Sequence, residues 1–491
     1  MQSKDQQTAW LPDLLYTDGR FESGLALITD TVTERVSHVT HDYEGLTNRV
    51  VRLKGRALLP GMVNAHSHAF QRVIRGRTEY RAHATDSFWT WREMMYAAAG
   101  RLSPEDLSDA ARMAFLEMLE GGITSVGEFH YLQHTPEGTP YGDVNVLAKA
   151  VVRAARDLGL RIALLRVAYA RSGFQMPPNP RQARFIEPEA DTFLQRLDAL
   201  RSELNGDAAD NPQGTNAPRA AWVGCAPHST RAVPLPYLHT VNAYANRHDL
   251  PLHMHVSEQP AENESCLAEH GRTPVTLLAD EGLLSERFTA VHAVHITPDE
   301  AHALARARTL VCACPTTERN LGDGVVPADV LWRAGVRVSL GTDSHAQIDL
   351  LEDARELEYH LRLQKLERAV LDSTHEAGDQ LASKDAGPNQ LSRLAALLFD
   401  CATRHGAASI GGESGALAAG RPADFFTVDL NDPSIAGTGA DDLLPAIVFS
   451  LARTAVREVV VGGELIVNGG RHPRREEIVS RFTALQRRLW A

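Results

Sequence analysis

The middle of the chain, from about residue 59 to residue 410, alternates short apolar runs with amphipathic stretches. Short apolar runs separated by helical patterns are typical of βα units that form a parallel sheet. Eight such runs are present, at residues 57–68, 123–131, 162–169, 222–229, 251–258, 288–295, 309–316 and 336–344. Because eight parallel strands with intervening helices close into a barrel, this pattern predicts an α/β fold with a (β/α)8 barrel.

The two ends of the chain show a different pattern. Residues 1–58 and 411–491 carry short β-like runs broken by turn residues, and the last run is followed by the helical stretch REEIVSRFTALQRRLW. We therefore predict one small β-sandwich domain built from both termini and ending in a helix. The predicted boundaries place this domain at residues 1–58 and 411–491, and the barrel at residues 59–410.

Three stretches interrupt the alternation. Residues 205–218 and 372–390 are polar and rich in turn residues, and we expect both to be surface loops. The run FWTWREMMY, at residues 88–96, is assigned to the first long loop of the barrel.

Composition and charge exclude several classes of protein. A chain of 491 residues with 43% hydrophobic and 23% charged residues is ordinary globular material. Its net charge of -12 is spread along the chain and no basic cluster is interleaved with aromatic residues, which argues against nucleic-acid binding. The first residues do not resemble a secretory leader, and no stretch approaches the roughly 18 apolar residues of a membrane span. A cytoplasmic protein is the expectation.

The cysteines support the same compartment. There are five, an odd number without a pairing framework, so disulfides are not expected. Cys312 and Cys314 form a C-x-C inside an apolar run. Because a buried cysteine behaves as a small hydrophobic residue, we interpret these two as strand residues rather than metal ligands.

Candidate chemistry is concentrated at the ends of the predicted strands. Residues able to bind a metal or move a proton end five of the eight runs: His66, His68, His228, His255, Glu258, His292, His295 and Asp343. The carboxyl ends of barrel strands converge on one face, which is where barrel enzymes carry their chemistry. A single histidine at such a position is more often a hydrogen-bonded structural residue, so the inference depends on the whole set.

Four of these residues make a plausible ligand set for one cation. His66 and His68 are two residues apart, so on a strand both project to the same side. A third histidine and Asp343 on other strands complete a nitrogen and oxygen set suited to Zn²⁺, and the same ligand types also suit a similar divalent ion such as iron. His253 and His255 repeat the two-residue spacing, and we choose His255 because a glutamate then follows it at H-x-x-E.

Five motifs match a known family. The runs LLPGMVNAHSH, HVSE, AVHAVH, LGTDS and GALAAGRPADFFTVD occur in this order and resemble the amidohydrolase superfamily, in particular its aminohydrolase branch. Binuclear members of the superfamily bridge two metals with a carboxylated lysine near the end of strand 3 or 4. This chain has no lysine at a strand end between residues 160 and 250. The resemblance therefore implies one metal ion per chain.

Within that branch, further motifs indicate the reaction. HSHAFQR, FWTWREMMY, GEFHYLQH, CAPHSTR and CPTTERNLGDG resemble members that hydrolyse N-formimidoyl-L-glutamate to N-formyl-L-glutamate and ammonia in histidine degradation. Purine and nucleoside deaminases usually carry a CPxSNxxL-like sequence where this chain reads CPTTERNLG. A guanine or adenosine-type deaminase remains the alternative enzyme, and a non-catalytic barrel scaffold is the alternative of another class. The resemblance also implies a homodimer.

The catalytic roles form a hypothesis. Asp343 would take a proton from the attacking water, Glu258 would carry a proton to the leaving nitrogen, and His292 would orient the attacking oxygen or stabilise its charge. For Glu258 the structural alternative is a salt bridge at the barrel rim.

The substrate implied by the resemblance is a dicarboxylate, and arginine pairs well with carboxylates because its planar fork makes two parallel hydrogen bonds. The positions that match the family's substrate-binding motifs are Gln71, Arg92, Tyr131, His228 and Arg231. For the two arginines the alternative is a solvated surface position. Glu318 and Arg319 either line the pocket or form an ion pair that fixes their loop.

Overall fold

A computed structural model describes residues 6–80, 88–209, 220–372 and 392–491. Its central feature is a parallel sheet of eight strands in which each strand pairs with the next along the chain. The strands are β6 (Met62–Ser67), β7 (Ile123–His130), β8 (Arg161–Ala168), β9 (Ala221–Pro227), β10 (Leu252–Val256), β11 (Phe288–His292), β12 (Leu310–Ala313) and β13 (Val338–Leu340). Each of the eight predicted runs contains or overlaps one of them, so the predicted barrel is confirmed.

The first and last strands close the barrel at the residues predicted to bind metal. A parallel bridge joins Ser67 to Asp343. The backbone N–H of Asp343 donates to the carbonyl of His66 at 3.0 Å, and the N–H of His68 donates to the carbonyl of Asp343 at 3.1 Å. Backbone hydrogen bonds therefore fix the two ends of the barrel wall relative to each other at this point.

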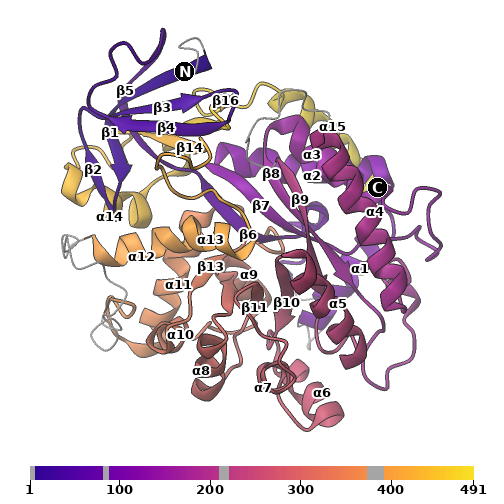
Figure 1. Ribbon diagram of the computed structural model, residues 1–491. Coiled ribbons are helices and arrows are strands. Elements are labelled where there is room, and N and C mark those ends of the chain that lie inside the picture. The colour runs from indigo at the N-terminus through magenta and orange to yellow at the C-terminus, as the bar shows by residue number, and fades with distance from the viewer. Residues whose placement is uncertain (1–5, 81–87, 210–219, 373–391) are drawn as a thin grey trace.

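Helices surround the barrel, as Figure 1 shows. They are α2 (Pro104–Glu120), α3 (Val146–Leu158), α4 (Ala190–Ala209), α5 (Leu235–His248), α6 (Pro260–His270), α7 (Pro274–Asp280), α8 (Pro298–Arg306), α9 (Pro315–Leu321), α10 (Ala328–Ala334), α11 (Leu350–Lys365), α12 (Arg393–Ala402) and α13 (Arg404–Ser409). Local sequence explains many of the ends. Ser103 and Asp106 form a capping box at the start of α2, and Gly159 ends α3 in the left-handed conformation.

Both termini contribute to a second sheet. Its strands are β1 (Gln7–Thr17), β2 (Arg20–Glu22), β3 (Ala26–Asp30), β4 (Arg35–Thr40), β5 (Arg49–Pro60), β14 (Phe425–Asp429), β15 (Val456–Val461) and β16 (Glu464–Val467). The order β16-β15-β14-β5-β1-β3-β4 joins the C-terminal strands to the N-terminal ones through the antiparallel pair β14 and β5. In Figure 1 the indigo strands lie beside the yellow ones. A separate sheet built from both ends of the chain is thus confirmed, while its exact boundaries stay a prediction.

The C-terminal part also contacts the barrel. Helix α14 (Ala440–Ser450) packs against α11 and α12, and the final helix α15 (Arg475–Trp490) packs against α2. Helix α15 covers the sixteen residues REEIVSRFTALQRRLW, which confirms the predicted final helix. Among the described residues, no helix combines the length and the apolarity that crossing a membrane requires.

Two of the predicted loops need correction. Residues 88–96 belong to helix α1 (Phe88–Ala99) rather than to a loop, because Met95, Tyr96 and Ala99 form a buried apolar face and neither glycine nor proline interrupts the run. Helix α4 continues to Ala209, so residues 205–209 of the stretch predicted as a loop are helical. A polar composition is typical of exposed residues, and it does not mark the end of a helix. Residues 210–218 and 373–390 lie outside the described residues.

Candidate metal centre and substrate pocket

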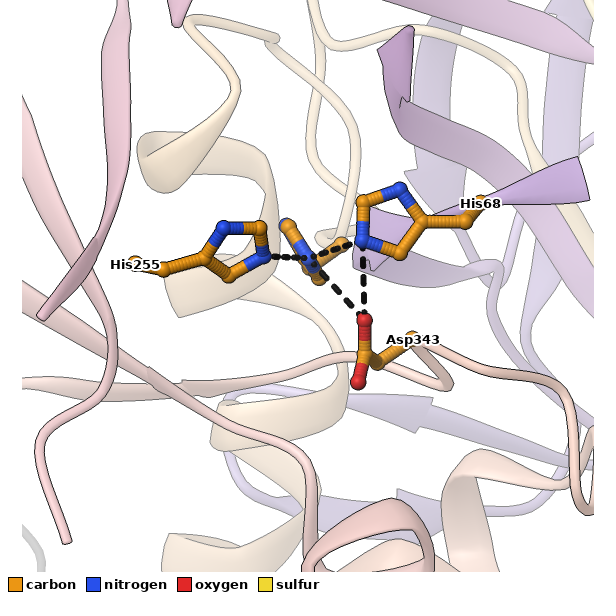
Figure 2. A group of neighbouring side chains, drawn as sticks. His68, His255 and Asp343 are labelled. Atoms are coloured by element: carbon orange, nitrogen blue, oxygen red, sulfur yellow. Dashed lines mark hydrogen bonds and ion pairs between the residues drawn. The ribbon is translucent and has the colours of Figure 1, made fainter. Parts of the chain in front are cut away.

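Three histidines and one aspartate meet at the carboxyl end of the barrel strands. Figure 2 shows His68, His255 and Asp343 pointing toward one another. Nε2 of His66 lies 3.2 Å from Nε2 of His68 and 3.1 Å from Nε2 of His255. Oδ1 of Asp343 lies 3.2 Å from Nε2 of His66 and 3.1 Å from Nε2 of His68. The structure therefore brings all four predicted ligands together, and all four are buried.

These spacings fit a single divalent cation. A tetrahedron with metal–ligand distances of about 2.0 Å has edges of about 3.3 Å, close to the separations observed between the four atoms. The imidazoles are oriented for this role: Nδ1 of His68 donates to the carbonyl of Phe129 at 2.9 Å, and Nδ1 of His255 donates to the carbonyl of His228 at 3.2 Å. The lone pairs of both Nε2 atoms then face the common centre.

His66 is held as a neutral ligand by its burial. Burial lowers the pKa of His66 to about 3, an effect that the hydrogen bond to Asp343 opposes only in part. Close packing fixes its position, because a Cβ added to Gly341 would lie 2.7 Å from the Cβ of His66. Nε2 of His253, the alternative to His255, donates to the carbonyl of Ser409 at 2.8 Å, and His253 is not part of the group.

Backbone strain accumulates beside the same centre. His292 has a φ of 71°, Asp343 a φ of 38° and His345 a φ of 59°, although none of them is glycine. Such conformations are costly and persist where the surrounding structure enforces them, commonly at functional sites. Here they turn the chain sharply at the ends of β11 and β13.

A buried carboxylate, Glu128, supports the segment that carries His66 and His68. It accepts hydrogen bonds from Oγ of Ser67 at 2.6 Å and from the backbone N–H of Ala69 at 2.8 Å. Burial raises the pKa of Glu128 to about 7. Sequence reasoning missed this residue, although a glutamate inside an apolar strand run was a signal for it.

His66, His68, His255 and Asp343 are called the metal group below. His292 lies between two carboxylates next to this group. Its Nε2 is 3.6 Å from Oε1 of Glu258, and its Nδ1 is 3.2 Å from Oε1 of Glu318. Its ring stacks on that of His255 with centroids 5.5 Å apart. Burial alone would lower the pKa of His292, but the neighbouring Glu258 and Glu318 raise it well above its usual value. Burial raises the pKa of Glu258, so this carboxyl is suited to holding a proton.

The structure separates the roles of Glu318 and Arg319, which the sequence left open. Glu318 is buried and faces His292, whereas Arg319 forms an ion pair with Glu356 of α11 at 2.5 Å. Neither residue lines the pocket beside the predicted metal ligands that is described below. The two therefore do not pair with each other.

A second group of potential ligands consists of His292, Cys314 and Glu318, whose ligand atoms lie within 4.8 Å of one another. Oε1 of Glu318 already accepts hydrogen bonds from the backbone N–H of Cys314 at 2.8 Å and from His292. We interpret this group as hydrogen-bonded packing, in line with the structural role expected for Cys314. All five cysteines are buried free thiols.

A pocket of about 520 Å³, counting its open mouth, adjoins the metal group. Its lining includes all of the predicted substrate-binding residues, Gln71, Arg92, Tyr131, His228 and Arg231, together with His68, His255, Glu258 and Asp343. Sequence reasoning did not single out the remaining lining residues, Trp91, Met95, Tyr96, Tyr169, Phe185 and Leu321. Several of them lie on α1, the helix that was predicted as a loop.

The pocket carries two neighbouring positive charges. Burial lowers the pKa of Arg92, and the nearby charge of Arg231 lowers it further. The guanidinium of Arg92 lies over the ring of Tyr96, 5.5 Å from its centroid. Nη1 of Arg231 is buried, and no described residue accepts a hydrogen bond from it. Two partly desolvated arginines in one pocket suit a ligand with carboxylate groups.

Comparison with known proteins agrees with these features. Residues 57–466 match the amidohydrolase family. The chain is 38% identical over 429 residues to a formimidoylglutamate deiminase of Pseudomonas aeruginosa, covering 87% of this chain and 88% of that protein. The crystal structure of an amidohydrolase from Brucella melitensis superposes with a TM-score of 0.85 at 32% identity, over 99% of this chain and 100% of the other.

A more distant structure shares the fold. An adenosine deaminase from Xanthomonas campestris with bound zinc superposes with a TM-score of 0.78 at 21% identity, over 99% of this chain and 98% of the other.

Proposed function

The chain belongs to the amidohydrolase family, and we propose that it hydrolyses N-formimidoyl-L-glutamate to N-formyl-L-glutamate and ammonia, a step of histidine degradation. The observation that carries this proposal is that the metal-binding group and two arginines share one pocket. The identity to the P. aeruginosa deiminase, which extends over most of both chains, supports the same substrate.

We propose that one Zn²⁺ ion is held by His66, His68, His255 and Asp343. Nitrogen and oxygen ligands in tetrahedral spacing suit zinc, and the absence of a suitably placed lysine supports a single ion. Such an ion supplies the Lewis acidity that makes water a nucleophile near neutral pH.

The protein's own residues then move the protons. The carboxylate of Asp343 accepts a proton from the attacking water. Glu258, which lines the pocket, delivers a proton to the nitrogen that leaves as ammonia. His292 is held by Glu318 with its Nε2 facing Glu258, where it stabilises negative charge on the oxygen added to the formimidoyl carbon.

The remaining pocket residues bind the substrate's carboxylates. Arg92 and Arg231 supply charge and paired N–H donors. Nε2 of Gln71 donates to the hydroxyl of Tyr131 at 2.9 Å, and the O–H of Tyr131 donates to Sδ of Met95 at 3.5 Å, so these side chains are held in place in the pocket lining. The ring of His228 lies beside them, 6.0 Å from that of Tyr131.

The alternative substrates, guanine and adenosine, carry no carboxylate. Binding one of them would leave the buried Nη1 of Arg231 without a carboxylate acceptor, at a cost of about 1 to 3 kcal/mol in affinity. Measuring ammonia release from formimidoylglutamate, guanine and adenosine distinguishes the proposed function from the two deaminase alternatives, and we expect release from formimidoylglutamate alone. A protein that contains its metal ion yet releases no ammonia from any of the three would instead favour the non-catalytic scaffold.

An arginine substitution tests the pocket directly. We expect Arg231→Met to raise KM for formimidoylglutamate by at least tenfold, since a charge-assisted hydrogen bond contributes about 1.5 to 3 kcal/mol. Arg319→Met is the matched control, because Arg319 is partly exposed and pairs with Glu356 outside the pocket. An unchanged KM in Arg231→Met would remove this residue from substrate binding.

We also propose a homodimer that works in the cytoplasm. The dimer rests on the family resemblance, and the five buried free thiols are what a reducing compartment favours. Light scattering of the purified protein measures the oligomeric state.

A further inference from the structure

Two tyrosines in the pocket share one hydrogen-bond donor behind them. Tyr96 of α1 and Tyr169, which follows β8, both line the pocket. Gln182, the last residue of the short helix η3 (Pro180–Gln182), lies behind them and is only 1% exposed. Its Nε2 donates to the hydroxyl of Tyr96 at 2.7 Å and to the hydroxyl of Tyr169 at 2.8 Å.

This arrangement sets the direction of both phenolic hydrogens. A phenol that accepts a hydrogen bond keeps its own O–H for another acceptor. Because Nε2 of Gln182 has two hydrogens and supplies one to each tyrosine, neither O–H is used on Gln182, and both remain available to a ligand in the pocket that the two tyrosines line. Arg231 lines the same pocket close to Tyr169, so a guanidinium lies beside one of these donors. Burial raises the pKa of Tyr96, which keeps that phenol protonated.

Tyr169 lies beyond His228 from the metal group, and Tyr96 is linked to it through their shared donor Gln182. The ring of His228 is 4.9 Å from that of His255, and the ring of Tyr169 is a further 4.6 Å from that of His228. One complete side chain thus separates Tyr169 from the nearest predicted metal ligand. In formimidoylglutamate the side-chain carboxylate is two bonds farther from the formimidoyl carbon than the α-carboxylate. With that carbon at the metal group, the side-chain carboxylate is the group that reaches the tyrosines.

We propose that Tyr96 and Tyr169, oriented by Gln182, bind the side-chain carboxylate of the substrate. Arg92 and Arg231 lie beside this subsite and supply the positive charge. The tyrosines touch the substrate, whereas Gln182 is a positioning residue that acts through them. This inference rests on the proposed function and extends it, because it makes the subsite the determinant of preference for a negatively charged side chain.

Two substrates and two conservative variants test the subsite. N-formimidoyl-L-glutamine has the same length as formimidoylglutamate but carries a neutral amide in place of the side-chain carboxylate. In Tyr96→Phe and in Tyr169→Phe we expect KM for formimidoylglutamate to rise about 10- to 100-fold, because each loses one charge-assisted hydrogen bond. We expect kcat to change little, and kcat/KM for the glutamine compound to stay near the wild-type value.

Gln182→Glu tests the positioning role. A carboxylate has no hydrogen to give, so it would accept from both tyrosines and turn their O–H groups away from the pocket. We expect this variant to lose the preference for formimidoylglutamate over the glutamine compound, as the tyrosine variants do. Tyr237→Phe is the control, because Tyr237 is also a buried tyrosine but does not line the pocket.

The outcomes separate the inference from the proposed function. Wild-type protein that releases no ammonia from formimidoylglutamate overturns both. An active wild type whose variants keep the substrate preference overturns the inference alone. Equal losses toward both substrates would show that Gln182 and the tyrosines serve only the fold, and would also overturn it. Thermal unfolding of each variant establishes that it is folded.

Discussion

Replacing Glu318 removes a carboxylate that never touches the substrate, yet we expect it to slow turnover. Oε1 of Glu318 accepts hydrogen bonds from Nδ1 of His292 at 3.2 Å and from the backbone N–H of Cys314 at 2.8 Å. The glutamate is 1% exposed, so water cannot replace it. Its charge orients His292 and favours the protonated imidazole that faces Glu258.

The size of the effect follows from these two hydrogen bonds. Glu318→Gln keeps the shape but replaces a charge-assisted bond with a neutral one, a difference of about 1 to 1.5 kcal/mol, or roughly tenfold in kcat. Glu318→Ala leaves two buried donors without an acceptor, at about 1 to 3 kcal/mol of stability each. We therefore expect the glutamine variant to be folded and slow, and the alanine variant to be unstable as well.

The assay measures kcat and KM for ammonia release, together with the metal content of each protein. For Glu318→Gln we expect kcat to fall about tenfold while KM and metal content stay unchanged, since Glu318 lies outside the pocket and the ligand group. Glu356→Gln is the matched control, because Glu356 pairs with Arg319 and His360 away from the site. A glutamine variant with wild-type kcat, or one that loses its metal, would refute the reasoning.

Four further outcomes are expected. Glu258→Gln should keep its metal but lose about 10² to 10⁴-fold in kcat, and near-normal turnover would exclude it as the proton carrier. A chelator should abolish ammonia release and added Zn²⁺ should restore it, whereas activity in metal-free protein would contradict the metal's role. Gly341→Ala should lower metal content measured by elemental analysis, because its Cβ would lie 2.7 Å from the Cβ of His66. Burial raises the pKa of Glu262 from 4.5 to about 7, so the folded state becomes less stable as pH rises through this range and the carboxyl ionises. Glu262→Gln removes this ionisation and should raise Tm at pH 8 but not at pH 4.5. An equal change in Tm at both pH values would argue against this role of Glu262.

The barrel could be predicted from the sequence because the local spacing of apolar residues indicates which segments form strands and which form helices. Each of the eight apolar runs contains or overlaps one strand, and the strand-end positions of His66, His68, His255 and Asp343 were enough to predict that they would converge. Motif resemblance also singled out five positions, predicted to bind substrate, that the structure places in the lining of one pocket. The prediction of α1 as a loop was wrong because Trp91, Arg92 and Tyr96 of this helix line the pocket. Polar and aromatic side chains on the buried side of a helix interrupt the regular spacing of apolar residues by which a helix is recognised in a sequence.

The sequence by itself determined the barrel, the two-ended second sheet and the residue types available for a metal site. Only the tertiary structure decided which of those residues act on one another. The bridge from Ser67 to Asp343, the contact of Glu318 with His292, and the shared donor Gln182 behind Tyr96 and Tyr169 each join residues that are distant in the chain or lie in irregular segments. Such contacts depend on how the barrel closes and where its loops fold back, and no local period encodes that.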